Sequence, residues 1–324
     1  MLARLSSLLL PALIGAGFAV SARAQEVTPA RCEAVLQALQ NAASQGGSTL
    51  QARYSGLTDG ACEYSDVAMA GESRYAPVVF ADKVVIAGSA LNWVSDGSVK
   101  SADLTLTAEA IRLTARSGDA RMDYLLQAQA RQGEMAFELR GNWDGAKKEL
   151  RVGLFDLQIG DSSRVKFGAL VKNIDISTPG AAQMALTGAA LSELDLELKS
   201  FGFFEQFLLP MLISRLPDSG GSDGDSEAGF ARVVAEKKLE LRTAINQLPD
   251  AAFPAPSRAA LAALLSDLPN PRGKLVVGFR SASGFGAARF ARFALAGMPK
   301  TMKELAPLFD DTRFVIDWRR GDRS

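Results

Sequence analysis

The stretch that decides the fold runs from Glu134 to Gly160 and reads EMAFELRGNWDGAKKELRVGLFDLQIG. Apolar and polar residues alternate at its start, where Met135, Phe137 and Leu139 occupy every second position. Such alternation is typical of a strand with one buried face. The Asn-Trp-Asp-Gly segment at 142–145 predicts a turn, and a second alternating run follows it. We therefore expect a hairpin of two long antiparallel strands.

The second strand of this hairpin changes phase part of the way along. Its apolar residues fall first on even-numbered and then on odd-numbered positions: Leu150, Val152 and Leu154, followed by Phe155, Leu157 and Ile159. One extra residue produces such a slip, because side chains alternate between the two faces of a sheet. The pattern predicts a β-bulge at Leu154–Phe155.

Alternation of the same kind extends over most of residues 63–199. Further segments are interpreted as strands: YAPVVFADKVVIAG, SADLTLTAEAIRLTAR, MDYLLQAQAR and MALTGAALSELDLELKS. Regular alternation indicates a sheet with one face buried and the other in water. Almost no helix-length segment separates these runs, so parallel crossovers are implausible. The predicted fold class is α+β, with a long, curved antiparallel β-sheet that forms a meander.

Helices are expected at both ends of this sheet region. Thr28 and Pro29 predict the start of an N-terminal helix. An amphipathic helix is expected over 230–248, and Ser257 is expected to cap the next one. Four parts follow in order: a signal peptide (1–24), the N-terminal helix and antiparallel sheet (25–200), a helical insert (201–270), and strands and helices that complete the same fold (271–324). We expect this C-terminal helical insert to pack on the concave face of the sheet.

The first 24 residues have the pattern of a cleavable signal peptide. The apolar run LLLPALIGAGFAV follows Arg4, and Ala22-Arg23-Ala24 matches the small-x-small site that signal peptidase cuts. The run is too short to cross a bilayer, which takes about 20 apolar residues. We therefore expect cleavage after Ala24, no retained transmembrane segment, and a periplasmic protein.

The chain contains two cysteines, Cys32 and Cys62. In an exported protein two cysteines most simply form one structural disulfide. Redox-active pairs usually stand two residues apart, so a redox role is disfavoured. The predicted bridge ties the N-terminal helix to a strand that begins near Cys62.

The composition argues against several kinds of chemistry. The chain has no histidine, which removes Ser-His-Asp and Cys-His catalytic systems and imidazole metal ligands. Lys and Arg together number 36, and so do Asp and Glu, so no basic excess indicates a nucleic-acid partner. Asp195 and Glu197 alternate with leucines and are expected to face solvent. We expect no catalytic residues, no cofactor and no metal site.

The apolar segment that follows Ser200 is the candidate binding region. Its FGFFEQFLLPMLI stretch is apolar on every side of a helix, and such a helix must be buried or in lipid. A helix of about 14 residues reaches about 21 Å, too short to span a membrane. Either it fills the concave face of the sheet as core, or it borders a groove for an acyl chain or another apolar ligand. The groove would be lined by Phe203, Phe207, Leu208, Met211 and Leu212.

Two segments carry a resemblance to a known group of proteins: LRGNWDGAKKELRVGLFDLQIGDSSRVKFGALVKNIDIS and LSELDLELKSFGFFEQFL. Over roughly Met135 to Leu216 they resemble bacterial periplasmic envelope proteins with AsmA-like long β-sheet architecture. The resemblance implies periplasmic residence and a role in envelope or lipid homeostasis, without enzymatic chemistry. The chain departs from that group in its short length and in that we expect no retained anchor. No functional residue is carried over from the resemblance.

Three functions remain as hypotheses from the sequence. The favoured one is a soluble, non-catalytic periplasmic protein that binds a lipid or other hydrophobic ligand in envelope homeostasis. The second is a scaffold for envelope assembly, whose protein partner docks on a sheet edge or on the helical insert. The third is a hydrolase that depends on a pair of carboxylates.

Overall fold

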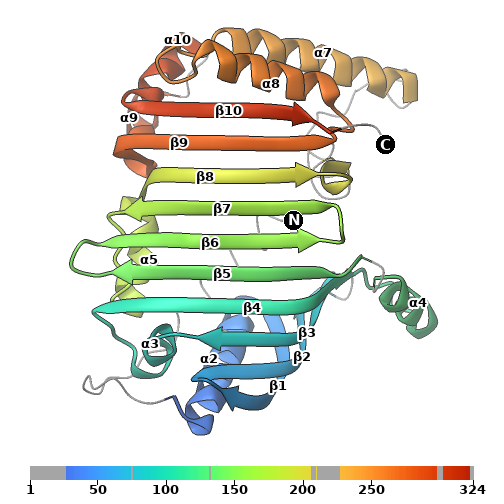
Figure 1. Ribbon diagram of the computed structural model, residues 1–324, viewed down its shortest axis with the longest axis vertical. Coiled ribbons are helices and arrows are strands. Elements are labelled where there is room, and N and C mark those ends of the chain that lie inside the picture. The colour runs from blue at the N-terminus through green and yellow to red at the C-terminus, as the bar shows by residue number, and fades with distance from the viewer. Residues whose placement is uncertain are drawn as a thin grey trace. The chain divides into compact units, whose positions relative to one another are not determined.

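The computed structural model describes residues 27–73, 76–130, 133–205, 209, 227–297 and 302–321. Ten strands form one open antiparallel meander, in which each strand lies beside its neighbours in sequence (Figure 1). The strands are β1 (Ser48–Thr58), β2 (Ala61–Gly71), β3 (Val78–Ala87), β4 (Ser101–Thr114), β5 (Met135–Asp144), β6 (Glu149–Ile159), β7 (Ser163–Lys172), β8 (Ala190–Ser200), β9 (Gly273–Gly286) and β10 (Thr312–Arg320). The predicted α+β class and antiparallel meander are confirmed.

The chain divides into two compact units. The N-terminal unit contains β1–β7 and the helices α2 (Pro29–Gln45), α3 (Ala90–Asp96), α4 (Ala120–Ala130) and α5 (Pro179–Gly188). The C-terminal unit takes in residues 162–164 and contains β8–β10 with α7 (Glu227–Asn246), α8 (Ala255–Asp267), α9 (Ala287–Ala296), α10 (Met302–Leu305) and the 3-10 helix η3 (Ala306–Phe309). Helices of the C-terminal unit therefore precede β9 and also separate β9 from β10.

The hairpin of β5 and β6 contains the predicted bulge. Arg140 pairs with Leu154 and Gly141 with Val152, so Gly153 has no partner on β5. The bulge lies one residue before its predicted position. The predicted turn is present but lies at residues 145–148 rather than 142–145, because Trp143 is a buried strand residue whose Nε1 donates to the Ile174 carbonyl at 2.9 Å.

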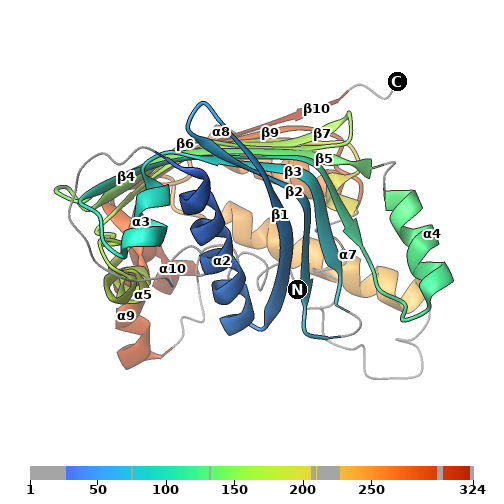
Figure 2. The same cartoon turned by 90° about the horizontal axis from the view of Figure 1, so that it is seen from below.

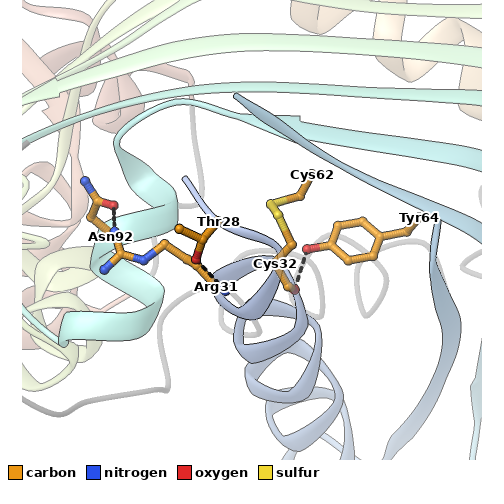
Figure 3. Close-up of a disulfide and its surroundings, with 6 residues drawn as sticks. All are labelled: Thr28, Arg31, Cys32, Cys62, Tyr64 and Asn92. Carbon is orange, nitrogen blue, oxygen red and sulfur yellow. Dashed lines mark hydrogen bonds between the residues drawn. A yellow bond between two sulfur atoms is a disulfide. The ribbon is translucent and has the colours of Figure 1, made fainter. Parts of the chain in front are cut away.

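The disulfide between Cys32 and Cys62 is confirmed, and it joins α2 to the start of β2 (Figure 3). Both cysteines are fully buried, and the Tyr64 hydroxyl donates to the Cys32 carbonyl at 2.8 Å. Burial raises the pKa of Tyr64, so the hydroxyl stays protonated and keeps donating. The predicted cap is also present, since Thr28 Oγ1 accepts from the Arg31 amide at 3.3 Å.

Two segments interpreted as strand are helices. MDYLLQAQAR lies mostly in α4, where the Asp119 side chain accepts from the amides of Arg121 and Met122 at 3.0 and 2.9 Å. MALTG lies in α5, whose start is capped by Thr178 through the Ala181 amide at 3.2 Å. In both cases side-chain capping of free amides decides the structure over the short alternating pattern.

The two edge strands of the sheet differ in how their free backbone N–H and C=O groups are kept from pairing with another chain. On β10, the Phe314 amide donates to the Ala252 carbonyl at 2.8 Å. The Ser257 hydroxyl donates to the Phe314 carbonyl and accepts from the Ile316 amide, both at 3.0 Å. Ser257 lies inside α8 rather than at its N-cap, so its predicted capping role is wrong. Its hydroxyl instead satisfies two backbone groups of an edge strand, which would otherwise be open to a foreign strand.

Strand β1 forms the opposite edge, where irregular pairing with β2 takes the place of hydrogen bonds from a helix. Its register with β2 shifts between Gln51 and Arg53 and again between Tyr54 and Gly56. Asp66, opposite the first shift, has a positive φ of 54° and forms an ion pair with Arg53 at 2.8 Å. Bulges and charges on an edge strand discourage pairing with another chain.

The buried hydroxyl of Ser257 supplies a direct test of the edge interaction. Ser257→Ala should lower the free energy of unfolding by about 1–3 kcal/mol, because a buried backbone carbonyl and amide lose their partner. Urea denaturation measures this loss. The control is Ser266→Ala in the same helix, whose exposed hydroxyl donates only to the Ala262 carbonyl. Equal stabilities of the two variants would contradict the assignment.

Candidate functional site

Three phenylalanines lie in a row across neighbouring strands of the N-terminal unit: Phe137 on β5, Phe155 on β6 and Phe167 on β7. The rings of Phe137 and Phe155 meet edge to face with centroids 5.1 Å apart, and those of Phe155 and Phe167 stack at 4.3 Å. We call these residues the phenylalanine row. All three side chains are half-buried, which leaves part of each ring accessible.

The bulge at Gly153 places the middle ring on the same face as its neighbours. Phe155 pairs with Leu139, and Leu157 pairs with Phe137, so apolar residues of both strands share one face. Without the extra residue, the alternation from Val152 would bring Asp156 to that face. Asp156 points instead to the other side, where its carboxylate lies 3.7 Å from the Lys166 ammonium group.

The same face of the N-terminal unit is covered by helices on other strands. Helices α2 and α3 pack over one cluster that includes Tyr64 and Ile86, and α5 packs over a second cluster around Trp143 (Figure 2). Phe137 shares the face of Trp143, because six residues separate them on one strand. The phenylalanine row belongs to neither cluster. It is an apolar surface beside two closed cores.

The residues predicted to line a groove are placed only in part. Phe203 follows β8 and is half-buried. Phe207, Leu208, Met211 and Leu212 lie outside the described residues, so the proposed groove stays a prediction.

Sequence reasoning assigned the residues of the phenylalanine row to the sheet but did not identify them as a site. The signal that could have found it is the phase slip, which gathers three aromatic residues on one face.

Charged residues predicted to face solvent do so. Asp195 on β8 forms an ion pair with Arg280 on β9 at 3.0 Å, and Glu197 pairs with Lys274 at 2.8 Å. These are exposed cross-strand pairs, which contribute little to stability. No cluster of potential metal ligands occurs among the described residues.

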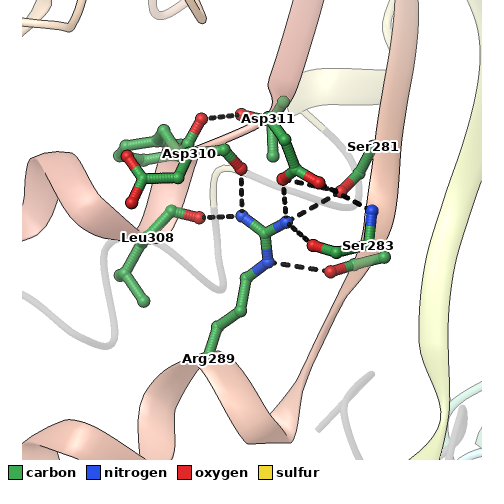
Figure 4. A network of polar contacts seen from close by, with 9 residues as sticks. Ser281, Ser283, Arg289, Leu308, Asp310 and Asp311 are labelled. Carbon is green, nitrogen blue, oxygen red and sulfur yellow. Dashed lines mark hydrogen bonds and ion pairs between the residues drawn. The ribbon is translucent and has the colours of Figure 1, made fainter.

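A second polar centre, in the C-terminal unit, surrounds Arg289 (Figure 4). The Arg289 side chain is only 11% exposed. Its guanidinium donates to three backbone carbonyls, two serine hydroxyls and one carboxylate. The acceptors are the carbonyls of Gly284, Leu308 and Asp310, the Oγ atoms of Ser281 and Ser283, and the carboxylate of Asp311. Every N–H of the guanidinium can find an acceptor in this arrangement. The cluster therefore ties α9 to β9, to η3 and to the turn before β10.

The carboxylate of Asp311 has a pKa lowered to about 2. Partial burial acts to raise this pKa, but the Ser283 amide, at 2.6 Å, and the Arg289 guanidinium outweigh it and favour the ionised form. Asp311 therefore stays ionised, and its negative charge pairs with Arg289 to hold α9 in place.

This pKa predicts acid sensitivity that Asp311→Asn should remove. Because the folded pKa lies below the unfolded value of about 3.9, the stabilisation is complete above pH about 4 and is lost as the pH falls toward 2. The difference in Tm between wild type and Asp311→Asn should therefore shrink over that range. Asp250→Asn, which alters an exposed carboxylate, serves as the control. A difference that stays constant with pH would contradict the assignment.

Within the part of the chain that the structure describes, no helix combines the length and apolar character needed to cross a membrane. No protein-family model matches the chain, and no curated protein is similar to it.

Proposed function

We propose that this protein is a non-catalytic periplasmic protein that binds a lipid or another hydrophobic ligand in envelope homeostasis. The observation that carries the proposal is the phenylalanine row, a set of contacting rings that remains half-buried while neighbouring parts of the same face form closed cores. Leu139 and Leu157 pair with residues of the row and extend its apolar character.

The chemistry of this surface suits an acyl chain. Each methylene group removed from water contributes about 0.8 kcal/mol, and aromatic rings on a rigid sheet lose little conformational entropy when a ligand binds. The carboxylate of Asp156, the residue after Phe155 on β6, is directed to the opposite face of the sheet. The surface offers apolar contact rather than a polar anchor, so we expect selectivity for chain length over headgroup.

The proposed compartment rests on the signal-peptide pattern of residues 1–24 and on the disulfide. A buried disulfide between Cys32 and Cys62 suits an oxidising compartment such as the periplasm. The resemblance to AsmA-like envelope proteins supports the same assignment. We also propose that the helical insert of residues 201–270 packs on the concave face of the sheet.

Ligand binding can be measured with cis-parinaric acid, a fluorescent fatty acid, on the purified protein. Phe167→Ala should weaken its binding about tenfold, which corresponds to about 1.4 kcal/mol of lost contact. The control is Tyr124→Ala on α4, which removes a ring that is 72% exposed and lies outside the row. Native mass spectrometry with lipid extraction would identify a co-purified ligand.

The ligand proposal fails if wild-type protein binds no fatty acid, or if both variants bind it equally well. Comparing the Tm of the variants separates a loss of binding from a loss of folding.

A second function, as a scaffold, is favoured by α4. This helix has no buried residue, and Met122, Tyr124 and Leu125 are 49%, 72% and 54% exposed. Exposed apolar residues that gather on one helix are typical of an interaction surface. The partner would be an envelope protein that contacts α4.

A photo-crosslinking residue at position 124, tested in cells, distinguishes the scaffold from the ligand binder. The scaffold predicts one discrete adduct that Leu125→Glu abolishes. The same residue placed at Thr58, an exposed position on β1, should give no adduct. Absence of any adduct at position 124 would rule out docking on α4.

A further inference from the structure

Helix α9 is oriented with Arg289 toward the protein and with Ala287, Phe290 and Ala291 toward solvent. Arg289 is held by the cluster of acceptors described above, and the neighbouring Phe293 is half-buried. Ala287, Phe290 and Ala291 are exposed, and Phe290 retains 44% of its accessible surface. A surface helix usually presents the opposite arrangement, with apolar residues inward and charged residues in water.

The contacts around α9 hold this orientation in place. Arg289 donates to carbonyls and hydroxyls of β9, η3 and the turn before β10, so rotating the helix would leave these acceptors and the guanidinium without partners. The Phe290 ring packs edge to face against the Phe285 ring, with their centroids 5.7 Å apart. This contact and the hydrogen bonds of Arg289 hold the exposed Phe290 ring in position.

The chain around α9 is strongly basic. Residues 268–303 contain seven Lys and Arg residues and no Asp or Glu, in a protein whose 36 basic and 36 acidic residues balance overall. The basic residues are Arg272, Lys274, Arg280, Arg289, Arg292, Lys300 and Lys303. Lys274, Arg280 and Arg289 form ion pairs with Glu197, Asp195 and Asp311. We therefore assign the attraction to a negatively charged surface to the other four, of which Arg292 belongs to α9 itself.

We propose that the exposed face of α9 docks on the surface of a bilayer that contains anionic lipid. Aromatic side chains on one face of a short helix enter the boundary between headgroups and acyl chains, and nearby basic residues are attracted to anionic headgroups. Ala287 and Ala291 flank Phe290 and let the helix lie close to the interface. This surface is separate from the phenylalanine row, so either proposal can fail without the other.

The test is flotation of the purified protein with vesicles of phosphatidylcholine that contain phosphatidylglycerol, and with vesicles of phosphatidylcholine alone. Wild-type protein should bind the anionic vesicles preferentially, and added salt should weaken binding. Phe290→Ser should reduce the binding about tenfold, whereas Phe290→Trp should retain it and shift its fluorescence to the blue on contact with vesicles. Val315→Ser, which removes a side chain that is 57% exposed on β10 of the same unit, should bind as wild type does.

Three results would overturn the proposal: no binding of wild type to anionic vesicles, equal binding to neutral vesicles, or unchanged binding of Phe290→Ser. No binding would assign the exposed face to a partner other than a membrane, such as an acidic protein. Equal binding to neutral vesicles would leave no role for the basic residues, and unchanged binding of Phe290→Ser would place the membrane contact outside α9. The Phe290→Trp variant controls for folding, because it preserves the ring contact with Phe285.

Discussion

Alternation of side chains between the two faces of a strand is the constraint on which this structure depends. In a meander, a change of phase in one strand would move its whole apolar set to the wrong face unless an extra residue absorbs it. Gly153 is that residue in β6. Because of it, Leu150 can pack near Trp143 while Phe155 joins the rings of its neighbours further along the strand. The closed core and the accessible aromatic surface thus follow from one local irregularity.

The backbone groups at the two edges of the sheet are protected in different ways. An exposed edge strand can pair with a strand of another chain, because its N–H and C=O groups lack partners. On β10, the hydroxyl of Ser257 and the carbonyl of Ala252 occupy positions that another strand would use. On β1, two register shifts and the ion pair of Arg53 with Asp66 interrupt the regular ladder. A helix thus completes one edge, and irregular geometry protects the other.

Much of the fold could be predicted from sequence because its signals are local. Long alternating runs predicted the strands, and two cysteines predicted the disulfide. The pair Thr28-Pro29 predicted a helix start correctly, but the same pair at Thr178-Pro179 was overlooked because a short alternating run follows it. The site was harder to predict. Which face of a strand stays accessible depends on where α2, α3 and α5 pack, and no pattern within β5–β7 contains that information.

The sequential order of the strands has a consequence for how the chain acquires its structure. Each strand pairs with the strand before or after it in sequence, and from β1 to β8 the longest connection is residues 115–134, whereas residues 201–272 lie between β8 and β9. A chain that emerges N-terminus first can therefore add one strand after another as far as β8, and only the β8–β9 pairing must close a long loop. The edge that is left incomplete until synthesis ends is the one that Ser257 finally closes, and until then each newly added strand is the exposed template on which aggregation would begin.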